Sequence, residues 1–239
     1  MQNNLCKIVG FIKPTNILEF GFGTGHTAVR IAHENPVSEV TAIDERENMV
    51  AVGKDLAIKR KVNNVVFLGA EMVEYVSAST TDLSDYDFIY LLYNFHHIKD
   101  APNAVDDKKK HYPKFDFLRK CYDSMSEDSF ICIADLFLPS NDDDEIAALF
   151  TNRVAEGDAS TFWSSLSSVE EQAISDARRV AEFCRRNEHE VGIKVRKREY
   201  EYPVTREWLK KAATKIGFRV FFDESVNSVG DAIVLLKKV

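Results

Sequence analysis

Short apolar runs alternate with segments of helical periodicity over residues 17–134. Apolar runs of this length, bounded by turn residues, are typical of buried strands. They predict strands at 17–20, 39–43, 65–68, 87–92 and 130–134. Apolar residues at helical spacing predict helices at 27–35, 48–61 and 115–125, the second with Met49, Val52, Leu56 and Ile58 on its apolar face. Strands and helices in alternation predict a parallel sheet with right-handed crossovers.

The C-terminal part returns to the same pattern after a long interruption. Thr205 is a candidate cap for a helix through Trp208 and Leu209, and Gly217 ends that helix. Residues 218–222 and 232–236 are the last two predicted strands. Seven strands with interleaved helices predict an α/β fold around a doubly wound, mostly parallel sheet.

Residues 139–204 do not fit this alternation and are too long for an ordinary connection. They open with the acidic run 141–145, which we expect to be a solvated turn. Ser167 or Ser168, followed by glutamates, predicts a capping box and a helix through residues 173–183. We interpret 139–204 as a helical lid or acceptor-binding insertion, and 1–138 with 205–239 as the core.

The segment 19–25, Glu-Phe-Gly-Phe-Gly-Thr-Gly, follows the first predicted strand. Glycine lets the backbone turn tightly and approach a ligand closely. A dinucleotide site would have the pattern Gly-x-Gly-x-x-Gly. His26 occupies the position of the third glycine and breaks that pattern.

Acidic residues stand at the ends of the first three predicted strands: Glu19, Asp44 and Glu71. A carboxylate such as Asp44 can accept both hydroxyls of a ribose, and Glu71 can accept from an exocyclic amine. Each residue taken singly is equally compatible with a helix cap or a solvated turn. The three together, beside the glycine turn, favour a nucleoside site.

Glu19-x-Gly21-x-Gly23-x-Gly25 followed by Asp44 resembles the signature of class I S-adenosylmethionine-dependent methyltransferases. The resemblance covers about residues 15–138 and the closing strands at 218–236, and it implies a Rossmann-like sheet whose last strand is antiparallel. Residues 87–98 resemble the fourth-strand motif of members that act on small molecules. Residues 125–130 depart from the family because the usual glycine turn is missing there.

The resemblance also implies residue roles for S-adenosylmethionine and its product S-adenosylhomocysteine. Gly21 and Gly23 would lie against the methionine part, and Glu19 would hold the turn and the amino group. Asp44 would take the ribose hydroxyls. The cofactor-binding set is Glu19, Gly21, Gly23, Gly25, Asp44, Glu71, Met72, Tyr93 and Asn94.

His96 and His97 follow the fourth strand and are candidate general bases for methyl transfer to oxygen or nitrogen. The alternative is that one of them faces the sheet core or caps the next segment. Asp135 ends the fifth strand, but no aspartate directly follows the fourth, so we expect no metal. Phe162, Trp163 and the arginines of the insertion are candidate acceptor contacts, although a packed core and a solvated face are the simpler interpretations.

A formal charge of -7 argues against nucleic acid as the main partner, and we expect a small-molecule acceptor. Four scattered cysteines, no apolar run of membrane-spanning length and no secretory signal predict a cytoplasmic protein without membrane association. The oligomeric state is left open. The alternative functions are a non-catalytic module that binds S-adenosylmethionine and an NAD-dependent oxidoreductase.

Overall fold

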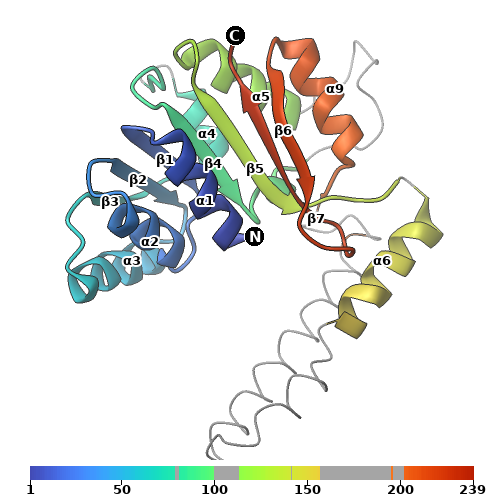
Figure 1. The fold of residues 1–239 in the computed structure, drawn as a ribbon, viewed down its shortest axis with the longest axis horizontal. Helices are drawn as coiled ribbons and strands as arrows, with labels where there is room; N and C mark the ends of the chain where they lie inside the picture. Colours follow the sequence, from blue (N-terminus) through green and yellow to red (C-terminus); the bar gives the residue numbers. More distant parts are fainter. Residues whose placement is uncertain (79–80, 100–112, 141, 157–194, 196–201) are drawn as a thin grey trace, which may run out of the picture.

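The computed structural model describes residues 1–78, 81–99, 113–140, 142–156, 195 and 202–239. Its centre is a seven-stranded sheet in the order β3-β2-β1-β4-β5-β7-β6 (Figure 1). The strands are β1 (Asn16–Phe20), β2 (Glu39–Asp44), β3 (Val65–Gly69), β4 (Phe88–Leu92), β5 (Phe130–Leu136), β6 (Arg219–Ser225) and β7 (Asp231–Lys237). β7 pairs antiparallel with both β5 and β6, and the other neighbours pair parallel. The predicted fold class is therefore confirmed.

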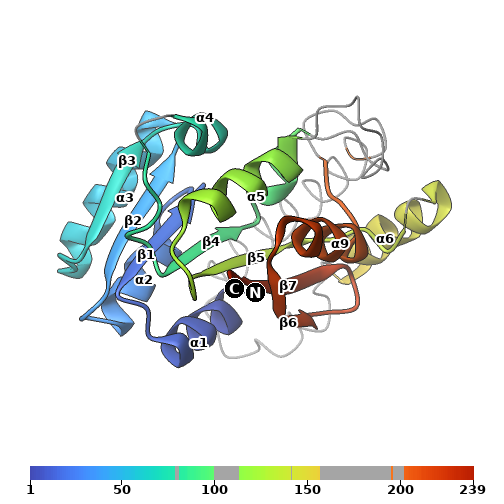
Figure 2. The ribbon, with the colours of Figure 1, turned by 90° about the horizontal axis from the view of Figure 1, so that it is seen from above.

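Helices cover both faces of the sheet (Figure 2). One face packs against α1 (Gln2–Ile12), α2 (His26–Glu34) and α3 (Glu47–Arg60). The other packs against α4 (Met72–Ser77), α5 (Pro113–Ser124) and α9 (Arg206–Ile216). Because both faces are covered, the central strands are buried along their whole length, which explains why they are continuous apolar runs in the sequence.

Several helical details differ from the sequence prediction. In α3, Val52 and Ile58 are exposed, and the helix instead buries Gly53 and Ala57 against its neighbours. A Cβ on Gly53 would lie 2.7 Å from the Phe67 ring, so small residues allow the close approach of α3 to β3. The prediction placed the larger apolar residues on the packed face and was wrong for these two.

The acidic run at 141–145 is not a solvated turn, because α6 (Asp143–Glu156) begins within it. Asp142 Oδ1 accepts hydrogen bonds from the backbone N–H of Asp144 at 2.9 Å and of Glu145 at 3.1 Å. These are N–H groups of the first helical turn, which lack partners within a helix. The acidic side chains therefore start a helix, as the helix dipole favours.

The first helix of the insertion packs at the end of β5 and the start of β7. Ile146, Leu149 and Phe150 of α6 form a small apolar cluster, completed by Leu136, Leu138, Val195 and Val229. The predicted helix at 173–183 and the candidates Phe162 and Trp163 lie outside the described residues. The division into core and lid remains a prediction. Among the helices that the structure describes, none has the length and apolar character needed to span a bilayer.

Candidate functional site

The glycine turn after β1 is held against the end of β2. Gly21 N–H donates to the Ile43 carbonyl at 2.7 Å, and Gly23 N–H donates to Asp44 Oδ2 at 2.9 Å. Gly21, Gly23 and Gly25 have φ angles of 70°, 56° and 77°, a region that other residues adopt only with strain. The turn therefore requires glycine at all three positions, as the sequence predicts.

Asp44 is almost fully buried and serves the turn as well as the cavity. Its Oδ1 accepts from the backbone N–H and the Nε of Arg46, each at 3.0 Å. Burial alone would raise the pKa of the Asp44 carboxyl, but the hydrogen bonds from Arg46 and Gly23 outweigh it and lower the pKa. Asp44 is therefore a carboxylate near neutral pH.

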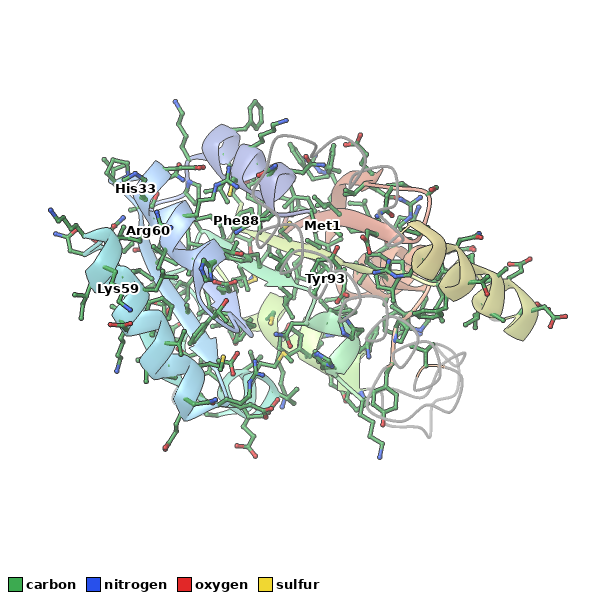
Figure 3. All side chains as sticks on the ribbon, turned by 90° about the horizontal axis from the view of Figure 1, so that it is seen from below. Met1, His33, Lys59, Arg60, Phe88 and Tyr93 are labelled. Carbon is green, nitrogen blue, oxygen red and sulfur yellow. The ribbon has the colours of Figure 1, made fainter. Side chains whose placement is uncertain are left out.

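A cavity of about 810 Å³ opens between the ends of β1, β2 and β4. It brings together eight of the residues predicted to form the site: Gly21, Gly23, Asp44, Glu71, Met72, Tyr93, Asn94 and His97. The sequence analysis did not identify Arg46 and Tyr202, which also line it. Tyr93 lies over the middle of the sheet, far from His33, Lys59 and Arg60 on the outer side of α2 and α3 (Figure 3).

Three predicted residues, Glu19, Gly25 and His96, are not among those that line the cavity. Gly25 is at the start of α2, where a Cβ would lie 2.9 Å from the Phe67 ring and 3.1 Å from Gly53. The absence of a side chain at Gly25 lets the start of α2 pack closely against β3 and α3. Glu19 is 2% exposed, and its Oε2 has no hydrogen-bond partner among the described residues. Burial raises the pKa of Glu19 to about 8, the Tyr90 hydroxyl partly offsets this, and the charge of Asp44 adds to it.

Glu71 is the N-cap of α4. Its Oε2 accepts a hydrogen bond of 2.7 Å from the backbone N–H of Glu74. The carboxylate lies at the cavity, but one of its oxygens is already used by the helix. The helix-cap alternative is thus correct, and only the second oxygen is left for a ligand.

His96 and Asp135 form a pair that the sequence analysis did not predict. His96 Nδ1 lies 2.5 Å from Asp135 Oδ1, and its backbone N–H donates to Asp135 Oδ2 at 3.0 Å. Asp135 is fully buried at the end of β5. Burial would raise the pKa of this carboxyl, but the adjacent His96 and the N–H groups of Leu136 and His96 lower it below its ordinary value. A carboxylate on Nδ1 fixes the orientation and the tautomer of an imidazole.

His97 stacks beside His96 with ring centroids 4.2 Å apart, and it lines the cavity. Both histidines belong to the short 3₁₀ helix η1 (Phe95–His97). The carbonyl of His96 also accepts from the Tyr202 N–H at 2.8 Å, which ties the chain leading into α9 to η1. The fully buried Lys114 donates to the Ile98 carbonyl just after η1. Three separate segments thus fix the histidines.

The stretch that contains the glycine turn and Asp44 is similar to a known family of domains. Residues 17–111 match the family model described as a methyltransferase domain. Over this stretch the chain is therefore similar to methyltransferase domains.

Solved structures share the methyltransferase fold at low sequence identity. An O-methyltransferase family protein from Burkholderia thailandensis is 10% identical, with a TM-score of 0.61 over 99% of this chain and 56% of its own. The protein YcgJ from Bacillus subtilis is 12% identical, with a TM-score of 0.59 over 100% of this chain and 98% of its own. The [4+2]-cyclase SpnF is also 12% identical, with a TM-score of 0.60 over 99% of this chain and 80% of its own.

These likenesses define the fold and leave the reaction open, since SpnF is named for a different chemistry. The chain also spans only 54% to 62% of the length of five of the methyltransferase structures that it matches. The activity must therefore be argued from the residues of the site.

Proposed function

We propose that this methyltransferase domain transfers a methyl group from S-adenosylmethionine to an oxygen or nitrogen of a small-molecule acceptor. The observation that carries the proposal is the cavity of about 810 Å³ between the glycine turn and Asp44, with His97 in its lining and the His96–Asp135 pair next to His97. The proposed cofactor site and the candidate bases would thus lie at the carboxyl ends of β1, β2, β4 and β5, where ligands bind in sheets of this kind.

The residues present fit the cofactor. The buried Glu19 Oε2 lacks a partner among the described residues, and an α-ammonium group near the turn would supply the missing charge. Gly21 and Gly23 bring the backbone to the cavity without a Cβ, and Asp44 would accept the ribose hydroxyls. The free oxygen of Glu71 and the Met72 backbone would face the adenine, while Tyr93 and Asn94 would border the methionine end.

When bound, S-adenosylmethionine supplies a methyl group on a sulfonium leaving group, so the protein need not activate the donor. Its task is to align the acceptor and to remove a proton from it. With Nδ1 oriented by Asp135, the His96 Nε2 is the nitrogen that would accept this proton. His97 lines the cavity and is the second candidate.

The acceptor would lie beyond η1, next to the insertion. The first helix of that insertion, α6, already packs at the ends of β5 and β7, close to Asp135. We infer that residues 139–204 help to enclose the acceptor, because transfer in competition with water requires an enclosed site.

Two measurements test the proposal. Calorimetric titration of S-adenosylhomocysteine into the purified chain should show binding that NAD does not displace. Incubation of S-adenosylmethionine with a panel of phenols, carboxylic acids and amines should yield products heavier by one methyl group. Displacement by NAD would contradict the methyltransferase assignment. Cofactor binding without transfer to any panel member would favour the non-catalytic module.

A further inference from the structure

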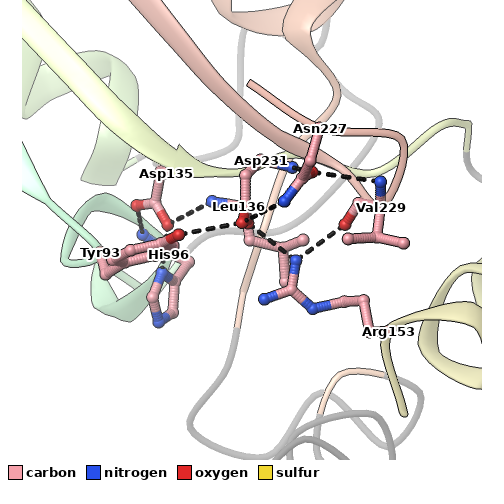
Figure 4. Close-up of polar contacts among 8 residues, drawn as sticks. All are labelled: Tyr93, His96, Asp135, Leu136, Arg153, Asn227, Val229 and Asp231. Carbon is pink, nitrogen blue, oxygen red and sulfur yellow. Dashed lines mark hydrogen bonds and ion pairs between the residues drawn. The ribbon is translucent and has the colours of Figure 1, made fainter. Parts of the chain in front are cut away.

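A hydrogen-bond network joins Tyr93, directly after β4, to α6 at the start of the insertion (Figure 4). Its centre is Asp231, the first residue of β7. Asp231 Oδ2 accepts from the Tyr93 hydroxyl at 2.9 Å and from Asn227 Nδ2 at 2.8 Å. Asp231 Oδ1 accepts from Arg153 Nη1 at 2.7 Å. Residues from three distant parts of the sequence thus share one carboxylate.

The ion pair within this network is well shielded from water. The side chains of Arg153 and Asp231 are each 10% exposed, and Arg153 Nη1 also donates to the Val229 carbonyl at 2.7 Å. Asn227 accepts from the Asp231 N–H at 3.0 Å and so fixes the turn before β7. A shielded pair with these additional hydrogen bonds holds a defined geometry, whereas an exposed pair would not.

Tyr93 is held in a strained backbone conformation. Its φ of 54° is in the left-handed region, which a bulky residue adopts at a cost. Such strain persists only where the surroundings fix the residue from several sides, and it is concentrated at ligand sites. Here the Tyr93 N–H donates to the Ala134 carbonyl of β5 at 2.8 Å, and its hydroxyl donates to Asp231 of β7.

The hydroxyl of Tyr93 remains a proton donor at any physiological pH. Burial and the adjacent charge of Asp231 raise the pKa of Tyr93 well above its ordinary value, although Arg153 opposes part of this effect. The Tyr93 side chain is 39% exposed and lines the cavity between the glycine turn and Asp44. A fixed phenol thus forms the wall of that cavity on the side toward β7.

We propose that Asp231 and Arg153 are positioning residues, which hold Tyr93 in place against the cofactor and make cofactor affinity depend on α6. This inference rests on the proposed function, because it assigns the cavity that Tyr93 lines to S-adenosylmethionine. Arg153 acts through Asp231, so the position of the first insertion helix is transmitted to the cofactor site. The packing of α6 through Arg153 and the binding of the cofactor would then favour each other.

The test is calorimetric titration of S-adenosylhomocysteine into variants of the 239-residue chain. Tyr93→Phe removes one hydroxyl and leaves the ring and the ion pair, and Arg153→Met removes the guanidinium. Each should weaken binding about tenfold, and Arg153→Lys should recover most of the loss. The double variant should bind no more weakly than the weaker single variant, because both changes break the same linkage.

Arg206→Met is the matched control, since Arg206 pairs with Asp223 at 3.3 Å between α9 and β6, away from the cofactor cavity. Its affinity should equal that of the wild type. If the wild type itself fails to bind, the proposed function fails. If the wild type binds and Tyr93→Phe binds equally well, the inference fails and the proposed function stands. Additive losses in the double variant would also overturn the inference. Because Tyr93→Phe keeps the ion pair, the test survives any failure of Arg153→Met to fold.

Discussion

The side-chain amide of Asn94 donates a hydrogen bond of 2.9 Å to the carbonyl oxygen of Gly21. The segment that follows β4 therefore contacts the glycine turn that follows β1. A Cβ on Gly21 would lie 1.3 Å from Asn94 Nδ2, so the absence of a side chain is what lets the two segments meet. The contact links the two strand ends that border the cofactor cavity.

Replacement of Gly21 by alanine should therefore displace Asn94 and impair the cavity. We expect Gly21→Ala to abolish measurable S-adenosylhomocysteine binding and to lower the free energy of unfolding by about 1–3 kcal/mol, since strain at a positive φ adds to the clash. Gly23→Ala is the control, because a Cβ there meets nothing within 4 Å and only backbone strain is added. Equal destabilisation of the two variants in urea titrations would show that Asn94 is not the obstacle.

Asp44→Ala should affect both the cofactor and the turn. Loss of two charge-assisted bonds to the ribose, each contributing about 1.5–3 kcal/mol, should weaken S-adenosylhomocysteine binding at least about tenfold in calorimetry. The melting temperature should fall too, because Gly23 N–H and Arg46 lose their acceptor. Arg46→Ala, which keeps the bond between Gly23 and Asp44, should cost less affinity. Unchanged affinity in Asp44→Ala would place the ribose elsewhere.

Glu19 predicts a pH dependence of both stability and binding. Its folded-state pKa is about 8, above the ordinary value of 4.5, so the folded protein binds the extra proton. Stability contributed by this proton is fully present below about pH 4.5 and is lost as the pH rises toward 8. Glu19→Gln should remove this component, so the wild type should lose more unfolding free energy than the variant between pH 5 and pH 8 in urea titrations.

A cofactor ammonium near Glu19 would favour the carboxylate and release its proton. The affinity for S-adenosylhomocysteine should therefore rise with pH and level off above about 8. Titrations in buffers of different ionisation enthalpy should detect proton release near pH 7. Proton uptake, or a flat affinity profile in the wild type, would contradict the placement of the ammonium.

Asp135→Asn should reduce transfer much more than cofactor binding. The variant keeps a side chain of the same shape but lacks the charge that orients and stabilises the protonated His96. With an acceptor identified from the panel, we expect a fall in kcat of about 10²-fold or more, in the range typical of general base catalysis. His96→Gln should lower kcat by a similar factor. The double variant with both changes should lower kcat little further. If His97→Gln abolishes transfer while His96→Gln does not, His97 is the base.

The Asp135 pair also has a defined pH window for stability. The folded-state pKa of Asp135 is lowered. Its carboxylate therefore stabilises the protein above the unfolded pKa of about 4, and this contribution is lost as the pH falls through the folded pKa. The stability difference between the wild type and Asp135→Asn should thus be larger at pH 5 than at pH 3. Urea titrations at pH 7, 5 and 3 measure it.

The sequence by itself determined the strands, their alternation with helices, the glycine turn and Asp44. These features are local: a strand buried on both faces is a continuous apolar run, and a tight turn at positive φ favours glycine. The resemblance carried by Glu19 to Asp44 predicted the similarity to methyltransferase domains that the family model shows for residues 17–111. Gly25 was included in the site for the same local reason, although its contacts with Phe67 and Gly53 serve helix packing.

Only the tertiary structure decided which side chains meet at the strand ends. Asp135 reaches His96 across 39 positions of the sequence, and Asp231 reaches Tyr93 across 138. The first contact depends on β4 pairing parallel with β5, which places Leu92 beside Ala134. The second depends on β7 lying antiparallel between β5 and β6, which pairs Leu136 with Asp231. A periodic pattern reports whether a residue is buried, but it carries no information on strand order or register. The partners of His96 and Tyr93 were therefore fixed by the sheet, because strand order and register alone bring their carboxylates to one edge.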